Sequence, residues 1–216
     1  MTTAQMHTAI GLILDDTAEA RWTTGIKDQA LNAAQYKIIK SFPNDMLLEL
    51  QTIETPITVS ATGYVLSGLT PLMIPNGFCA CKVILIGAVV PNIWTRHIWV
   101  DSMEFRGQNY YMKGGDSTPI SYIFGGSLYV LLDTYTAANC SLYYIGTPPP
   151  MVDNGQASSL DITRHDLLVS AACAELLRWE GEIDQASIFD RQVGAEILLE
   201  IQNFQNEKSR RNREQS

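Results

Sequence analysis

The sequence predicts an α+β fold in which two helical hairpins form a four-helix bundle, with an antiparallel β-sandwich or barrel module inserted between them. Apolar residues recur at steps of three and four in residues 1–45 and again in residues 163–206. Between these segments, short stretches dense in Thr, Val, Ile and Tyr alternate with Gly and Pro. Neither hairpin can bury its apolar stripe alone, so we expect the two hairpins to pack together.

Residues 1–45 are expected to form the first hairpin. In its second helix Leu31, Ala34, Ile38 and Phe42 share one face, and Pro43 should end the helix. The first helix carries a similar stripe and is followed by "DD" at Asp15 and Asp16, which we expect to be solvated.

Residues 46–146 are expected to form the β module, with six or seven short strands. In "SYIFGGSLYVLLDTY", Gly125 and Gly126 separate two apolar runs and predict a tight hairpin. The run "CKVILIGAVV" does not alternate, which is typical of a strand buried on both faces.

Residues 147–162 contain "TPPP" and are expected to be a stiff linker, followed by the second hairpin in residues 163–206. Thr163 and Asp166 have the spacing of a capping box for its first helix, and Asp184 can cap its second. That last helix carries a stripe nearly five turns long, which we expect to pack on the first hairpin: Ala186, Phe189, Val193, Ile197, Ile201 and Phe204.

A short basic segment, residues 207–216, follows this helix, although the chain has a formal net charge of −8. Its cations are Lys208, Arg210, Arg211 and Arg213. Ten polar residues with no apolar anchor are expected to be unfolded until a partner orders them. A solvated terminal segment is the plain alternative.

No catalytic motif stands out, and we expect neither an enzyme nor a cofactor. The three histidines lie in three different segments, and His165 is expected to be solvated in the first turn of a helix. Cys79 and Cys81 form a C-x-C, but no second pair of ligands stands at a useful spacing, so no metal site is expected. Reduced, mostly buried thiols are the better expectation.

The aromatic residues of the β module favour an interface. Trp94 and Trp99 bracket an arginine, and Tyr110 and Tyr111 follow. Stacking on nucleic-acid bases is the alternative, but the surrounding charge is negative, so a subunit or tail interface is the stronger expectation.

The bulk composition sets further limits. Charged residues make up 18% of the chain, which suggests that some uncharged surface is covered by partners. The acidic balance argues against sequence-independent binding to nucleic acid, which needs a basic surface. The longest apolar run, residues 83–90, is too short to cross a membrane.

Three stretches resemble the head-to-tail connector proteins, or portal adaptors, of tailed bacteriophages. In "ARWTTGIKDQALNAAQYKIIKSFPNDML" an Arg-Trp pair precedes a helix of Leu-Asn-x-Ala-Gln type that Pro closes. "SLYYIGTPPPMV" is similar to the family's final strand, and "LLVSAACAELLRWEGEIDQASIFDRQVGAEI" to its closing hairpin.

The resemblance implies a structural virion protein, made in the host bacterium, that forms a ring of twelve copies beneath the portal ring after DNA packaging. It implies that double-stranded DNA passes through the ring without specific binding, and that a tail or tail-nozzle protein docks below. It also implies that residues 207–216 reach the portal. A carbohydrate- or receptor-binding module of a virion, built on the β-sandwich, is the alternative.

Overall fold

The computed structural model describes residues 1–60, 62–84, 93–98, 118–131, 138–152, 155 and 157–214. The chain folds into two compact units. We call Met1–Leu50 with Pro148–Ser216 the helical unit, and Gln51–Thr147 the β unit. The fold is therefore mixed α and β, with helices α1, α2, α4 and α5 and two four-stranded sheets in the described residues.

Both helices of the expected first hairpin are present. Helix α1 spans Thr3–Ile13, where Thr2 and Gln5 form a reciprocal capping box. Helix α2 spans Thr24–Ser41 and ends before Pro43, as predicted. Its predicted stripe of Leu31, Ala34, Ile38 and Phe42 is buried throughout.

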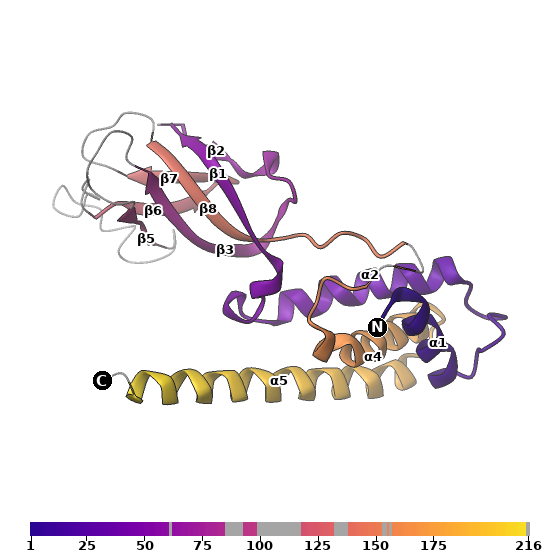
Figure 1. Cartoon of the computed structure of the whole chain (residues 1–216). Helices are drawn as coiled ribbons and strands as arrows, with labels where there is room; N and C mark the ends of the chain where they lie inside the picture. Colours follow the sequence, from indigo (N-terminus) through magenta and orange to yellow (C-terminus); the bar gives the residue numbers. More distant parts are fainter. Residues whose placement is uncertain are drawn as a thin grey trace. The chain divides into compact units, whose positions relative to one another are not determined.

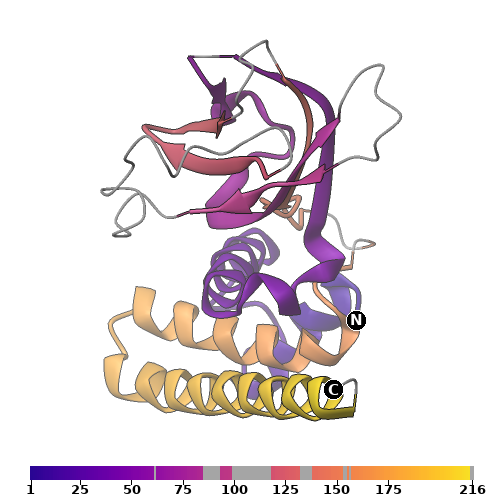
Figure 2. The ribbon, with the colours of Figure 1, turned by 90° about the vertical axis from the view of Figure 1, so that its left-hand side faces the viewer.

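Helix α4, His165–Trp179, is the central helix of the helical unit. It lies between α2 and helix α5, Ile183–Glu214, in both views of the ribbon (Figure 1 and Figure 2). Its consecutive small residues Ala171, Ala172, Cys173 and Ala174 point in different directions around the helix and are all buried, so both neighbours can approach closely.

The expectation that α5 packs directly on the first hairpin is wrong in its main contact. The α5 residues Ala186, Val193 and Ile197 are buried, but the helix packs along α4. Lys37 of α2 still reaches α5, because its Nζ lies 2.8 Å from Asp190 Oδ1. The helices are thus layered, with α4 in the middle.

Both caps predicted for the second hairpin differ from those observed. Asp161, not Thr163, begins this region: its carboxylate accepts from the Thr163 N–H, and a 3-10 turn over Ile162–Arg164 leads into α4. Helix α5 begins at Ile183, so Asp184 lies inside its first turn, where a carboxylate stabilises the helix dipole.

The return segment after the β unit is held on α2 by two polar side chains of the Leu-Asn-x-Ala-Gln stretch. Asn32 donates to the Met151 carbonyl at 3.0 Å and accepts from the Met151 N–H at 2.8 Å. Ser158 donates to the Gln35 side chain at 2.6 Å, and Gln35 is fully buried. The Pro-rich segment is therefore fastened at two points of the helical unit.

The β unit contains two sheets whose side chains share one apolar core. The first sheet has the order β1-β8-β3-β4, with β1 Gln51–Val59, β8 Ala138–Gly146, β3 Met73–Ile84 and β4 Ile93–Trp94. The second has the order β2-β7-β6-β5, with β2 Tyr64–Val65, β7 Ser127–Leu131, β6 Ile120–Phe124 and β5 Arg96–His97.

The hairpin predicted at Gly125–Gly126 is confirmed: these two glycines join β6 to β7, and both have positive φ, 57° and 76°. A two-residue turn that follows the strand twist needs such angles, which glycine adopts without strain.

Two strand predictions need correction. The module is not wholly antiparallel, because β5 pairs with β6 in parallel. Residues 98–119 separate these strands, which is long enough for the crossover that a parallel pair needs. The end of β3 also alternates: Cys81 and Val83 are buried, whereas Lys82 and Ile84 are half-buried, so only one face meets the core. Residues 85–90 of that predicted strand lie outside the described residues.

Candidate functional site

The predicted basic segment is the distal end of α5. The helix continues through Lys208, Arg210, Arg211 and Arg213 to Glu214, so the expectation of an unfolded segment is wrong. We call residues 207–214 the basic arm. Helix α5 has 32 residues against 15 in α4 and runs on beyond it (Figure 1).

The arm is helical because its sequence supports continuation of an existing helix. Extending a helix that has already nucleated costs far less than starting one. Arg211 and Glu207 lie 3.8 Å apart and Arg210 and Glu214 3.3 Å apart, both one helical turn away along the arm. Such pairs each stabilise a helix by about 0.2–0.5 kcal/mol. These local ion pairs depend on residue spacing, which composition alone does not show.

The arm presents its cations to solvent. The side chains of Arg210 and Arg211 are 80% and 76% exposed, and those of their partners Glu214 and Glu207 are 65% and 69% exposed. Lys208 reaches back to the helical unit, where its Nζ lies 2.6 Å from Asp45 Oδ2 and 6.0 Å from the centre of the Phe204 ring. The arm is therefore a charged helical surface joined to the helical unit at its base.

A groove of about 370 Å³ lies at the base of the arm, and we call it the α5 groove. Apolar side chains and Asn203 form part of its wall: Met46, Leu48 and Phe204 are the apolar ones. Four carboxylates and one cation complete the lining: Asp45, Glu49, Glu200, Glu207 and Arg164. An apolar surface edged with excess negative charge suits a cationic protein segment.

Arg164 organises the inner end of this groove. Its side chain is only 8% exposed and donates from Nη1 to Glu49 Oε1 at 2.7 Å and from Nε to Glu200 Oε1 at 2.9 Å. The guanidinium also lies 4.4 Å from the centre of the Phe42 ring. Three chain segments thus meet at one cation, and the distal half of α5 is fixed to the helical unit.

The structure describes only one of the four aromatic candidates, Trp94. Trp94 is 53% exposed on β4, its ring lies 5.1 Å from that of Tyr143, and Lys82 Nζ lies 5.3 Å from it. Trp99, Tyr110 and Tyr111 lie outside the described residues. Trp94 is therefore available to a partner on this face of the β unit, whereas the predicted cluster stays a prediction.

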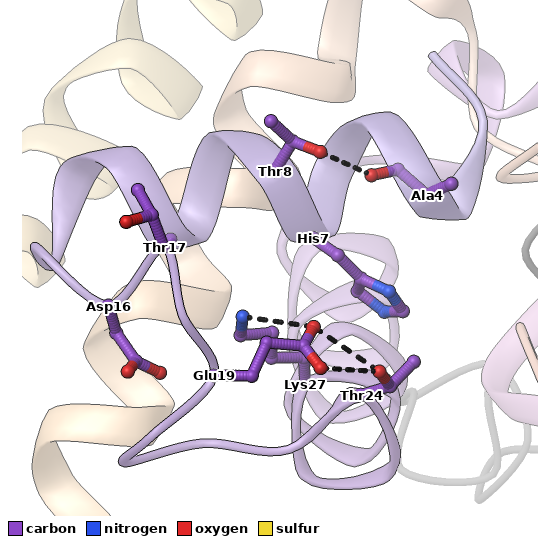
Figure 3. A pocket seen from close by; sticks show the side chains of 9 residues that line it. Ala4, His7, Thr8, Asp16, Thr17, Glu19, Thr24 and Lys27 are labelled. Carbon is purple, nitrogen blue, oxygen red and sulfur yellow. Dashed lines mark hydrogen bonds and ion pairs between the residues drawn. The ribbon is translucent and has the colours of Figure 1, made fainter.

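A second hollow, of about 220 Å³, lies between α1 and the start of α2 (Figure 3). Glu19 accepts from Thr24 Oγ1 at 3.0 Å and lies 3.4 Å from Lys27 Nζ, while His7 Nε2 lies 2.9 Å from Asp28 Oδ1. Each of these polar groups is paired within the chain, so the hollow is better suited to holding the hairpin than to binding an ion.

Asp16, expected to be solvated, is buried at the edge of this hollow. Its two oxygens accept from the N–H groups of Arg21 and Trp22 at 3.0 and 2.9 Å. Burial alone would raise the pKa of Asp16, but the backbone donors of Trp22, Arg21 and Ala20 lower it below its usual value. The Arg-Trp pair noted in the sequence is thus held by an aspartate five and six residues earlier.

His165 is also buried, contrary to expectation. Its Nε2–H donates to the Leu160 carbonyl at 3.2 Å, so Nδ1 is the acceptor, here from the Met1 amino group. Burial lowers the pKa of His165, which keeps it neutral. Both ring nitrogens are used in holding the chain, which leaves none for general acid or base chemistry.

The cysteines do not form a metal site among the described residues, where no cluster of three or more His, Cys, Asp or Glu could hold an ion. Cys79 lies in an irregularity of β3 between Phe78 and Ala80, and of the two residues only Cys81 is fully buried. The Cys81 thiol forms a hydrogen bond with the side chain of Cys140 on β8. This hydrogen bond and burial both raise the pKa of the Cys81 thiol. None of the four cysteines, all of which lie in the described residues, forms a disulfide.

No helix in the part of the chain that the structure describes combines the length and hydrophobicity needed to span a membrane.

Comparison with known proteins places the chain in a family. A comparison with curated proteins finds no match. The model of the SU10 adaptor protein family matches residues 1–215. The chain therefore belongs to the SU10 adaptor protein family, a family of phage head-to-tail adaptors.

Proposed function

We propose that the protein forms a ring of twelve copies beneath the portal after DNA packaging, extends the DNA channel and provides the surface on which the tail assembles. Membership of the family supports a structural adaptor role in the virion, with portal and tail components as partners. The ring, its copy number and the channel are our own inferences.

One observation carries the proposal: α5 extends past α4 into an arm with four cations, two of which are about four-fifths exposed. An exposed helix supported mainly at its base has little role within its own chain. Arginine pairs with carboxylates through two parallel hydrogen bonds, so Arg210, Arg211 and Arg213 can bind an acidic face of the portal. Lys208, the fourth predicted portal contact, is already paired with Asp45 within the chain.

The ring multiplies this weak binding. One exposed ion pair is worth about 0–1 kcal/mol, but copies linked in a closed ring bind at high effective concentration. Each chain has a formal net charge of −8, so a ring of them would carry a strong negative potential. That charge disfavours contact with DNA phosphates, which suits a channel through which DNA must slide.

Mixing the purified protein with portal rings tests the proposal. Negative-stain class averages should gain a second ring beneath the portal, and replacing the three arm arginines with Ala should abolish it. The matched control replaces Arg191, an arginine on the exposed face of the same helix, which should leave the second ring intact. A second ring formed equally well by the arm variant would contradict the role of the arm.

One observation favours the alternative of a binding module. Trp94 exposes half of its surface and lies beside Tyr143, and flat aromatic surfaces of this kind stack on sugar rings. Under this reading Trp94→Ala abolishes glycan binding by the isolated protein and leaves portal binding unchanged. Under the adaptor reading Trp94 contacts a neighbouring subunit or the tail, and the isolated protein binds no glycan.

A further inference from the structure

The α5 groove has more negative than positive charge, and its innermost charges are already matched. Arg164 is shared by Glu49 and Glu200, whose oxygens lie within 3 Å of it. The two carboxylates at the rim, Asp45 and Glu207, have side chains 60% and 69% exposed. The outer part of the groove can therefore accept a cation without disturbing the buried ion pairs.

The chain's own Lys208 shows which chemistry fits there. Its ammonium lies 2.6 Å from Asp45 and 6.0 Å from the centre of the Phe204 ring, so it is placed between a carboxylate and an aromatic face. Because both members of this ion pair are more than half exposed, the pair is weak and exchanges readily with another cation.

An apolar residue at the rim adds a second element of recognition. Leu48 is 66% exposed at this rim. In a protein interface, a large apolar side chain of this kind is usually covered by the partner. A protein segment with a lysine or arginine beside an apolar side chain matches this lining. Its cation would lie toward Asp45 and Phe204, and its apolar group would lie over Leu48.

We propose that the α5 groove is a docking site for such a segment of the portal protein, and that this segment displaces Lys208 from Asp45. The assignment to the portal rests on the proposed function of the arm. Glu207 belongs to both the groove and the arm, so a partner that lies on the arm also lies against the groove. Lys208 is then a removable cover of the groove, whereas the three arginines are direct contacts.

Binding of full-length variants to portal rings tests this inference. Leu48→Lys places a permanent cation at the rim and should weaken binding by about tenfold, since like charges in one interface repel. Leu12→Lys is the matched control, because Leu12 of α1 is 67% exposed and lies outside the groove. Equal binding by the two variants would overturn the proposal.

Lys208 gives a test of opposite sign. If the groove takes a portal cation, Lys208→Met removes a competitor, and binding should be unchanged or up to about threefold tighter. Weaker binding would show that Lys208 is itself a portal contact and would overturn its assignment as a cover. The arm variant lacking Arg210, Arg211 and Arg213 tests the proposed function separately, because those residues do not line the groove.

Crosslinking identifies the occupant. Leu48 replaced by the photocrosslinking residue p-benzoylphenylalanine should join to a portal peptide that contains a lysine or arginine. A crosslink to residues 207–214 of a second adaptor copy would assign the groove to contacts within the ring and overturn the proposal. The absence of any crosslink, in complexes whose assembly still depends on the arm arginines, would also overturn it and leave the proposed function standing.

Discussion

Arg164 and Glu49 form a short ion pair, 2.7 Å from Nη1 to Oε1, between two 3-10 turns that are 115 residues apart in the sequence. One turn ends the first helical hairpin, and the other begins α4. Because Glu200 of α5 binds the same guanidinium, this cation connects the start and the end of the helical unit.

Replacing Arg164 should therefore be costly. Arg164→Met leaves two carboxylates facing each other with no cation between them and removes the packing on Phe42. We expect a loss of about 3 kcal/mol in the free energy of unfolding, which is the lower end of the range for broken buried pairs, because Glu200 is partly solvated. Arg191→Met on the exposed face of α5 should cost less than about 0.5 kcal/mol. Denaturant titration measures both, and equal costs would mean that Arg164 does not hold the helical unit.

Two adjacent residues of α5 should differ sharply on truncation. Ile197 is 8% exposed and Leu198 is 61% exposed, because successive residues of an α-helix point in directions about 100° apart. Ile197→Ala should lower the free energy of unfolding by roughly 2–4 kcal/mol through lost burial and a residual cavity. Leu198→Ala should change it by less than about 0.5 kcal/mol. A reversed order would show that the packed face of α5 is a different one.

Deleting residues 207–216 should leave the helical unit folded. The arm contributes exposed ion pairs only, so we expect the free energy of unfolding to change by less than about 0.5 kcal/mol. Portal binding should fall, and high salt should reproduce the fall in the intact protein because screening weakens exposed pairs. Binding that survives both treatments would return the arm to a solvated end of the helix.

Mild acid should destabilise the protein through its buried histidines. Burial lowers the pKa of both His165 and His97 in the folded state. In the unfolded chain a histidine titrates near about pH 6.5, so the unfolded state binds more protons below that pH. Stability is thus complete above about pH 6.5 and falls as the pH drops toward the folded-state pKa values.

A His165→Gln variant isolates one contribution to this acid sensitivity. Gln keeps a donor that can reach the Leu160 carbonyl but does not titrate, so unfolding of the helical unit should depend less on pH between 7 and 5 than in the parent protein. Carboxylates whose pKa is lowered, such as Asp16 and Asp190, act in a separate window near about pH 4. An identical pH profile for variant and parent would exclude His165 as the source.

Local chemistry was predictable from the sequence, whereas long-range pairing was not. The end of α2 before Pro43 and the hairpin at Gly125–Gly126 depend on backbone geometry that these residues set by themselves. The packing of α5 on α4 could not be read from its stripe, because an apolar face does not specify its partner. The four-helix bundle as such stays a prediction beyond the layered helices described above.

The charged side chains show the same limit. Arg164 gave no signal in "ITRHDLL", because its partners Glu49 and Glu200 are 115 and 36 residues away. Asp16 and His165 looked solvated because a carboxylate or imidazole is usually exposed unless hydrogen bonds support its burial. The cations of the basic arm, by contrast, were identified from composition alone, although their helical state was not.

A cryo-EM structure of portal rings incubated with the full-length protein tests the central claim most directly. We expect a closed ring of adaptor beneath the portal, with α5 continuous to residue 214 and its arginines against portal carboxylates. Adaptor density absent from the portal, or attached with the arms pointing into solvent, would contradict the assignment of the basic arm as the docking element.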